Sequence, residues 1–126
     1  MERTITICGK EVKLRASALA PRIYRFKFGR DIFKDFAILN KNYREVLNSQ
    51  DSDEDKQIKQ LSILDLTIFE NLAWVFARQG DPENVPDSPD AWLDTFDGTF
   101  SIYEVLPQII DLWNVSSTTQ ATPAKK

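Results

Sequence analysis

The residue types that most often carry enzyme chemistry are scarce in this sequence. It contains no histidine, so it lacks the commonest general base, the usual member of a catalytic triad and the commonest metal ligand. Asp94 and Asp97 could form a carboxylate pair, but nothing beside them in the sequence would give one the role of acid and the other that of base. No glycine-rich phosphate loop and no nucleophile elbow is present. We therefore predict a protein that is not an enzyme, with no catalytic residue and no cofactor.

Three aspartates form the pattern closest to a metal site. Asp51, Asp53 and Asp55 occupy positions 1, 3 and 5 of a calcium-binding loop. Position 6, which requires glycine, is a lysine, and Ser62 stands at position 12, where a bidentate glutamate belongs. Residues 48–60 are polar, with almost no apolar side chain, and this composition is typical of a solvated loop. The sequence therefore predicts no metal site.

A basic and aromatic stretch is the best signal for nucleic-acid binding. Its cations are interleaved with aromatic rings, as phosphate contacts and base stacking require: Arg22, Arg25, Lys27, Arg30 and Lys34 with Tyr24, Phe26 and Phe28. On a helix, however, Ile23 and Phe26 would turn inward and leave the cations on a solvated face. The chain as a whole is acidic and holds no recognisable nucleic-acid module. We therefore predict no nucleic-acid partner and treat Arg22, Arg25 and Arg30 as candidate protein-binding residues.

The charges of the chain are divided between its two parts. Residues 1–47 carry eleven Lys/Arg and five Asp/Glu, a net +6, and residues 48–126 carry five and fourteen, a net −9; together these give the −3 of the whole chain. A small domain with opposite halves can bind copies of itself head to tail, which makes rings or open spirals. We expect such self-association, and the alternative is a chance asymmetry of solvated charges.

Length and composition indicate one soluble domain with a real core. No apolar run is long enough to span a bilayer, so no membrane partner is expected. The single Cys8 excludes an internal disulfide framework and fits a reducing cytoplasm. We predict a helical domain over residues 1–115 and a flexible tail over residues 116–126, which has no aliphatic side chain larger than alanine.

The first elements are two short strands with alternating apolar residues. The alternation predicts a hairpin over residues 4–15 with a turn at Gly9–Lys10. In this register Ile5 lies opposite Leu14, and all the aliphatic residues share one face. Because a lone hairpin is marginal in water, this face should lie on the helices or on another copy.

The stretch 62–78 predicts the helix around which the others pack. Its apolar residues cover more than half of the helical circumference, whereas a surface helix needs only a stripe. Ser62 and Asp65 have the spacing of a capping box, and Gly80 suits the left-handed position after a helix. The predicted fold class is therefore mainly α: a small domain of about five helices around a central helix, with an N-terminal β-hairpin.

Two large apolar residues, Ile63 and Trp74, fall among the polar residues of this helix. They indicate either a third packing neighbour or a contact for another chain. Both are kept as candidate protein-binding residues.

Four further helices are expected on either side of this stretch. One should follow an N-cap at Ser17 and end near Phe28, and one should run from Arg30 or Asp31 to Leu47. The others are predicted at 89–96, after an N-cap serine, and from residue 102 to residue 113 or 114, with a kink at its internal proline.

Several short blocks together resemble a known family. The segment 21–31, which reads PRIYR followed by KFGRD, resembles the signature of the tail assembly chaperones encoded by long-tailed phages and prophages of Gram-positive bacteria. Weaker blocks follow in the expected order: Glu70-Asn71-Leu72-Ala73-Trp74, Trp92-Leu93-Asp94, Val105-Leu106-Pro107 and Leu112-Trp113. Phe26 departs from the family pattern, in which a small residue is expected.

The resemblance implies a role in building the phage tail in the host bacterial cytoplasm. Such chaperones coat the long, hydrophobic, helical tape measure protein, help to recruit tail tube protein, assemble into rings or spirals, and are absent from the mature virion. Their genes usually contain a programmed frameshift that adds a C-terminal extension to a minority product. Ile63 and Trp74, if exposed, could then grip a tape measure helix. The alternatives are another phage structural or neck protein, or a generic helical adaptor for protein interactions.

Overall fold

The computed structural model of the chain describes residues 2–47, 62–98 and 100–121. The described part is mainly helical and begins with a two-stranded antiparallel hairpin, as predicted. Its elements in chain order are β1 (Glu2–Ile7), β2 (Lys10–Arg15), α1 (Ala20–Phe28), α2 (Ile32–Leu47), α4 (Ile63–Gly80), α5 (Pro89–Leu93) and α6 (Ile102–Ala121). The predicted loop 48–60, with its three aspartates, lies outside the described residues.

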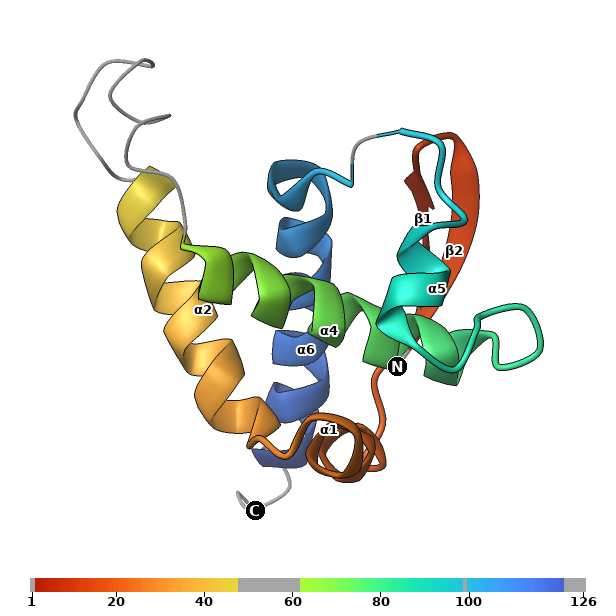
Figure 1. The fold of residues 1–126 in the computed structure, drawn as a ribbon. Coiled ribbons are helices and arrows are strands. Elements are labelled where there is room, and N and C mark those ends of the chain that lie inside the picture. Colours follow the sequence, from red (N-terminus) through yellow and green to blue (C-terminus); the bar gives the residue numbers. More distant parts are fainter. Residues whose placement is uncertain (1, 48–61, 99, 122–126) are drawn as a thin grey trace.

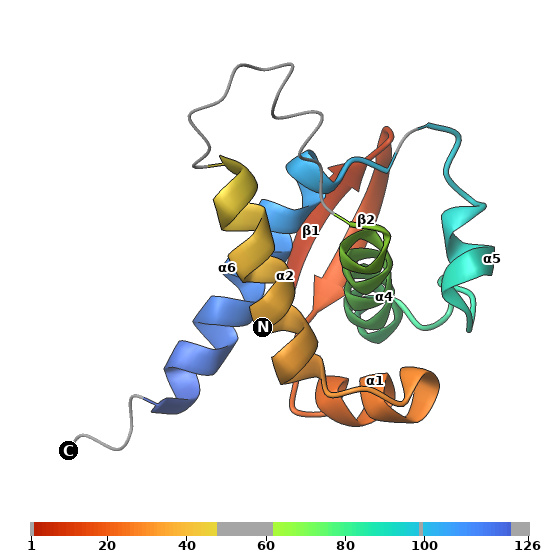
Figure 2. The same ribbon diagram turned by 60° about the vertical axis from the view of Figure 1, so that its left-hand side comes forward.

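Helix α4 contacts α1, α2, α5, α6 and strand β2. In two views, α2 and α5 lie on opposite sides of α4 (Figure 1 and Figure 2). These neighbours explain why every residue from Leu72 to Ala77 is buried, although a helix with a single neighbour buries only one stripe. Strand β1 in turn contacts α6, so the hairpin lies between two helices that are far from it in sequence.

The hairpin turn differs from the prediction by one position. Cys8 and Gly9 both have positive φ, 53° and 77°, as the central residues of a type I′ turn require. Ile5 therefore pairs with Val12, and the predicted register, with its turn at Gly9–Lys10, is wrong by two residues. Because side chains alternate with a period of two, this shift leaves all the aliphatic residues on the buried face.

The start of α4 confirms the predicted capping box. The Ser62 Oγ accepts a hydrogen bond from the Asp65 backbone N–H at 3.1 Å, and the Asp65 carboxylate accepts one from the Ser62 N–H at 3.1 Å. The other oxygen of this buried carboxylate accepts a hydrogen bond from the Asn42 side chain of α2 at 3.0 Å. The cap therefore also joins two helices.

The end of α4 corrects the role predicted for Gly80. This glycine is the last residue of the helix and does not have positive φ. A Cβ atom at this position would lie 2.2 Å from the carbonyl oxygen of Lys13 in β2. Glycine is therefore required by the close approach of the β2 backbone, and not by a left-handed conformation.

Three other helix boundaries differ from the prediction. Helix α1 begins at Ala20 because Ser17 forms a turn of its own, in which its carbonyl accepts the Ala20 N–H at 3.0 Å. Helix α5 ends at Leu93, where the Thr95 hydroxyl donates to the carbonyl of Trp92. Helix α6 was expected to end at residue 113 or 114 but continues to Ala121, since no glycine or proline interrupts residues 108–121. The part of the predicted tail up to residue 121 is thus helical, and residues 122–126 lie outside the described chain.

Candidate protein-interaction surface

The connection between α1 and α2 is built from the residues of the 21–31 block. Gly29 has a left-handed φ of 68° and donates its N–H to the carbonyl of Arg25 at 2.8 Å, which ends α1 as predicted. Asp31 then accepts the N–H of Phe33 at 2.9 Å with its side chain, which caps α2. Only three residues separate the helices, so this corner is tightly specified.

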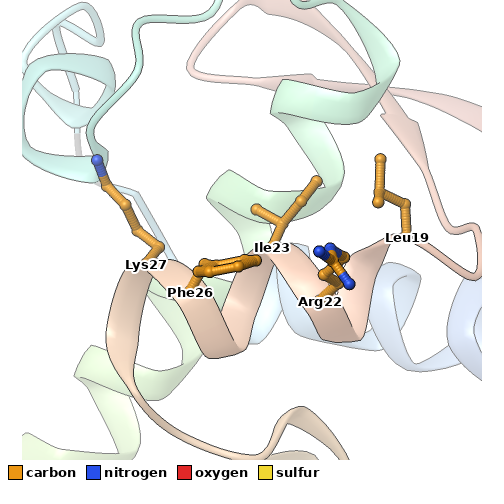
Figure 3. Close-up of a pocket in the computed structure, with 5 residues that line it drawn as sticks. All are labelled: Leu19, Arg22, Ile23, Phe26 and Lys27. Carbon is orange, nitrogen blue, oxygen red and sulfur yellow. The ribbon is translucent and has the colours of Figure 1, made fainter.

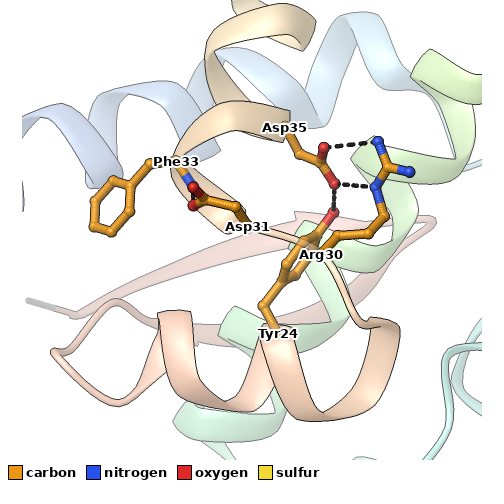
Figure 4. Close-up of polar contacts among 5 residues, drawn as sticks. All are labelled: Tyr24, Arg30, Asp31, Phe33 and Asp35. Atoms are coloured by element: carbon orange, nitrogen blue, oxygen red, sulfur yellow. Dashed lines mark hydrogen bonds and ion pairs between the residues drawn. The ribbon is translucent and has the colours of Figure 1, made fainter.

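A buried carboxylate holds the same corner from inside (Figure 4). Asp35 of α2 is 2% exposed and accepts two hydrogen bonds from the Arg30 guanidinium, at 2.6 and 2.9 Å. It also accepts one from the hydroxyl of Tyr24 in α1, at 2.7 Å. A buried charge is tolerated only when it is paired and hydrogen-bonded in this way.

The protonation states of this cluster follow from its contacts. Burial by itself raises the pKa of Asp35, but the hydrogen bonds from Arg30 and Tyr24 and the guanidinium charge outweigh it and hold the pKa below its ordinary value. Burial, together with the hydrogen bond to Asp35, raises the pKa of Tyr24. Asp35 therefore stays ionised and Tyr24 stays a donor over the physiological range.

We expect Tyr24→Phe to lower the free energy of unfolding by about 1.5–3 kcal/mol at pH 7, because a hydrogen bond to a charged group is lost. Folding lowers the pKa of Asp35 below the value of about 3.9 that an aspartate has in the unfolded chain. Ionised Asp35 therefore contributes its full stabilisation at pH values above about 3.9, and this contribution is lost as the pH falls through the pKa of the folded state. Urea unfolding at pH 7 and pH 3 should therefore show the difference between wild type and variant shrinking in acid.

Tyr43→Phe is the matched control for this prediction. It removes the hydroxyl of another buried tyrosine that lies on α2 and does not bond Asp35. The difference that it produces should not change with pH. A Tyr24→Phe difference equally constant between pH 7 and pH 3 would contradict the role given to the Asp35 charge.

The three candidate arginines do not form one site. Arg30 is committed to Asp35, although 45% of its side chain is exposed. Arg22 and Arg25 are exposed on α1, and the Arg22 guanidinium lies 5.1 Å from the centre of the Phe26 ring. Arg30 is thus a structural residue in this fold, and Arg22 is the arginine that borders an exposed apolar group.

Trp74 is not available for a partner in this structure, which favours the first of the two interpretations of this residue, a third packing neighbour. It is 3% exposed, and its indole Nε1 donates to the carbonyl of Pro86 at 2.9 Å. The ring of Phe28 meets it edge-on at 5.9 Å, and the Lys27 ammonium lies 5.5 Å from its centre. Ile63 begins α4, and its side chain lies outside what the structure describes.

The most exposed large apolar side chain of the described residues belongs to Phe26, at 75%. Phe26 was expected to turn inward, but Ala20 and Tyr24 occupy the buried face of α1, and Phe26 is about 200° around the helix from Tyr24. With Leu19, which is 52% exposed, and the half-buried Ile23 it lines an open depression of about 310 Å³ (Figure 3).

The segment 81–98 carries six carboxylates and no cation. Two lysines bind it from other elements: Lys27 donates to the Asp87 carbonyl at 2.7 Å, and Lys10 donates to the Thr95 hydroxyl at 3.1 Å. Burial, with the nearby charge of Asp90, raises the pKa of Glu70 on α4. The acidic segment is therefore attached beside the basic end of α1.

No group of three or more His, Cys, Asp or Glu side chains in the described residues could hold a metal ion, and no described helix is long and apolar enough to cross a membrane. Comparisons with protein families, curated proteins and solved structures find no match to this chain. Within the described chain, the apolar face of α1 and its bordering cations are the strongest candidate for a binding surface.

Proposed function

We propose that this chain is a phage tail assembly chaperone. In this role it binds and solubilises the tape measure protein and helps to recruit tail tube protein while the tail is built in the host cytoplasm. The proposal rests on the resemblance of the 21–31 block and on one observation about that block. Its inner residues fix the α1–α2 corner, while Phe26, with Leu19 before the block, leaves apolar surface exposed. A chaperone for a hydrophobic helical client needs such a surface and no reactive cleft.

In this proposal the core of the fold is a scaffold and its surface binds the client. Helix α4 serves as the central helix of the scaffold, which its contacts with four helices and β2 support. The outer surface then binds the tape measure protein. The opposed charges of residues 1–47 and 48–126 support assembly of several copies, head to tail, around a long client.

Co-expression tests this function directly. We expect the tape measure protein of the same phage or prophage to be insoluble when produced alone, and soluble and co-purified when this chain is produced with it. Phe26→Gln should reduce the soluble fraction severalfold, because a polar side chain replaces the most exposed apolar group.

Ala37→Gln is the control, because it places the same side chain at an exposed position of α2. It should leave the soluble fraction unchanged. Tape measure protein that stays in the insoluble fraction beside abundant, folded wild-type chain would overturn the proposed function.

A further inference from the structure

Three apolar residues in and just before α1 have the spacing of a coiled-coil seam; Leu19 and Phe26 are exposed and Ile23 is half-buried. Leu19, Ile23 and Phe26 are separated by four and three residues, as d, a and d positions are. Arg22 then occupies the g position and Lys27 the e position, so one cation lies on each side of the apolar row. In coiled coils the a and d residues provide the contact, and the e and g charges choose the partner.

The side chains are arranged as this pattern requires (Figure 3). The apolar row lines the open depression, and Arg22 and Lys27 border it. Both cations are held in place, since Arg22 lies over the Phe26 ring at 5.1 Å and Lys27 donates to the Asp87 carbonyl at 2.7 Å. A positioned cation loses less freedom on binding than a mobile one.

The same pattern argues against a second copy of this chain as the occupant. Two α1 helices would bring Arg22 and Lys27 against cations of the same kind, which disfavours pairing. The acidic segment 81–98 has the opposite charge, but its large apolar side chains, such as Trp92 and Phe96, pack against the core of their own chain. That segment therefore has no large aliphatic or aromatic ridge to place on Phe26.

We infer that the outer face of α1 binds an amphipathic helix whose apolar a and d residues are flanked by Glu or Asp at the e and g positions. Apolar contact with Leu19, Ile23 and Phe26 holds the helix, and Arg22 and Lys27 select its charge. The inference rests on the proposed function for the identity of the client, and it adds the chemistry of the client segment that docks here. Client segments with basic flanks are rejected.

Two synthetic peptides test this charge selection. Each contains four heptads with Leu at every a and d position; one carries Glu and the other Lys at every e and g position. With a fluorescent label and the full chain, anisotropy should report about tenfold tighter binding of the Glu peptide at low salt, because two opposite-charge pairs replace two like-charge pairs. The preference should shrink at high salt as the charges are screened.

Matched charge reversals locate the surface. Arg22→Glu should abolish the preference for the Glu peptide, and Arg25→Glu should leave it intact, since Arg25 is also exposed but does not line the depression. Phe26→Ala should weaken binding of the Glu peptide without unfolding the protein. Circular dichroism of each variant confirms that it is folded.

Three results would overturn the inference. They are equal binding of the two peptides, an effect of Arg25→Glu as large as that of Arg22→Glu, and a Phe26→Ala variant that loses oligomer mass in light scattering without any peptide. The last result would assign the face to another copy. If the peptide assay shows no charge preference but the tape measure protein is soluble and co-purifies with this chain, only the inference is overturned. If the Glu peptide binds selectively but the tape measure protein stays insoluble, only the proposed function is overturned.

Discussion

Trp74→Ala is expected to lower the free energy of unfolding by about 3–5 kcal/mol, the cost of removing a large buried aromatic side chain. The ring fills space between α4, Phe28 of α1 and the segment that contains Pro86. Its loss leaves a cavity and also leaves the Pro86 carbonyl without the indole donor. Urea denaturation followed by circular dichroism measures this change.

Two variants show whether burial is the cause. Trp74→Phe keeps most of the packing and should cost clearly less than the alanine variant, and Phe26→Ala removes an exposed ring and should change stability by less than about 0.5 kcal/mol. A Trp74→Ala variant as stable as wild type would mean that the indole does not lie where the structure places it. If Trp74→Ala also failed to bind the tape measure protein, the cause would be the damaged fold, because Trp74 is buried.

Gly80→Ala is the second variant for which we expect a large change in the free energy of unfolding. Two opposite contributions, helix propensity and a steric clash, determine the result. Alanine improves the helix propensity at the end of α4 by up to about 1 kcal/mol. Its Cβ would, however, lie 2.2 Å from the Lys13 carbonyl oxygen, and the obstacle is backbone that cannot rotate away. We expect the clash to win, with a net loss of about 2–3 kcal/mol, near the upper end for overpacked positions.

Thermal unfolding of Gly80→Ala and Gly98→Ala compares this site with a milder one. At Gly98 an added Cβ would meet the Cys8 Sγ at 3.3 Å, and the end of a side chain can yield. The Gly98 variant should therefore unfold close to wild type. A stabilised Gly80→Ala variant would contradict the close contact between α4 and β2.

Local chemistry explains which features the sequence predicted. The capping box of Ser62 with Asp65 and the N-cap at Ser88 depend on neighbouring residues, and the structure confirms both. The mainly helical class with an N-terminal hairpin is confirmed for the same reason, because hydrophobic periodicity is also local.

Features that depend on distant residues were not predictable. The periodicity of α4 places Trp74 among polar residues, and only the positions of α1 and the Pro86 segment bury it. Gly80 follows a helical stretch, which is typical of a cap, and the nearby Lys13 backbone is not visible in the sequence. The hairpin register was ambiguous because a shift by two residues buries the same face.

The candidate surface was predicted in part. Arg22 was named from its charge, but Arg30 was named with it and is bound to Asp35. Phe26 was expected to turn inward together with Ile23. In the structure the buried residues of α1 are Ala20 and Tyr24, and Phe26 lies on the opposite side of the helix from Tyr24.

The contact of β1 with α6 sets an order of events during synthesis. Arg3 and Asp111, which are joined by an ion pair of 2.9 Å, are 108 positions apart. At a translation rate of about 5–20 residues per second, α6 emerges roughly 5–20 seconds after β1. A hairpin alone is marginal in water, and for this time it lacks α6, one of the two helices that it contacts. The ribosome must therefore synthesise the chain as far as α6 before β1 can reach its native contacts.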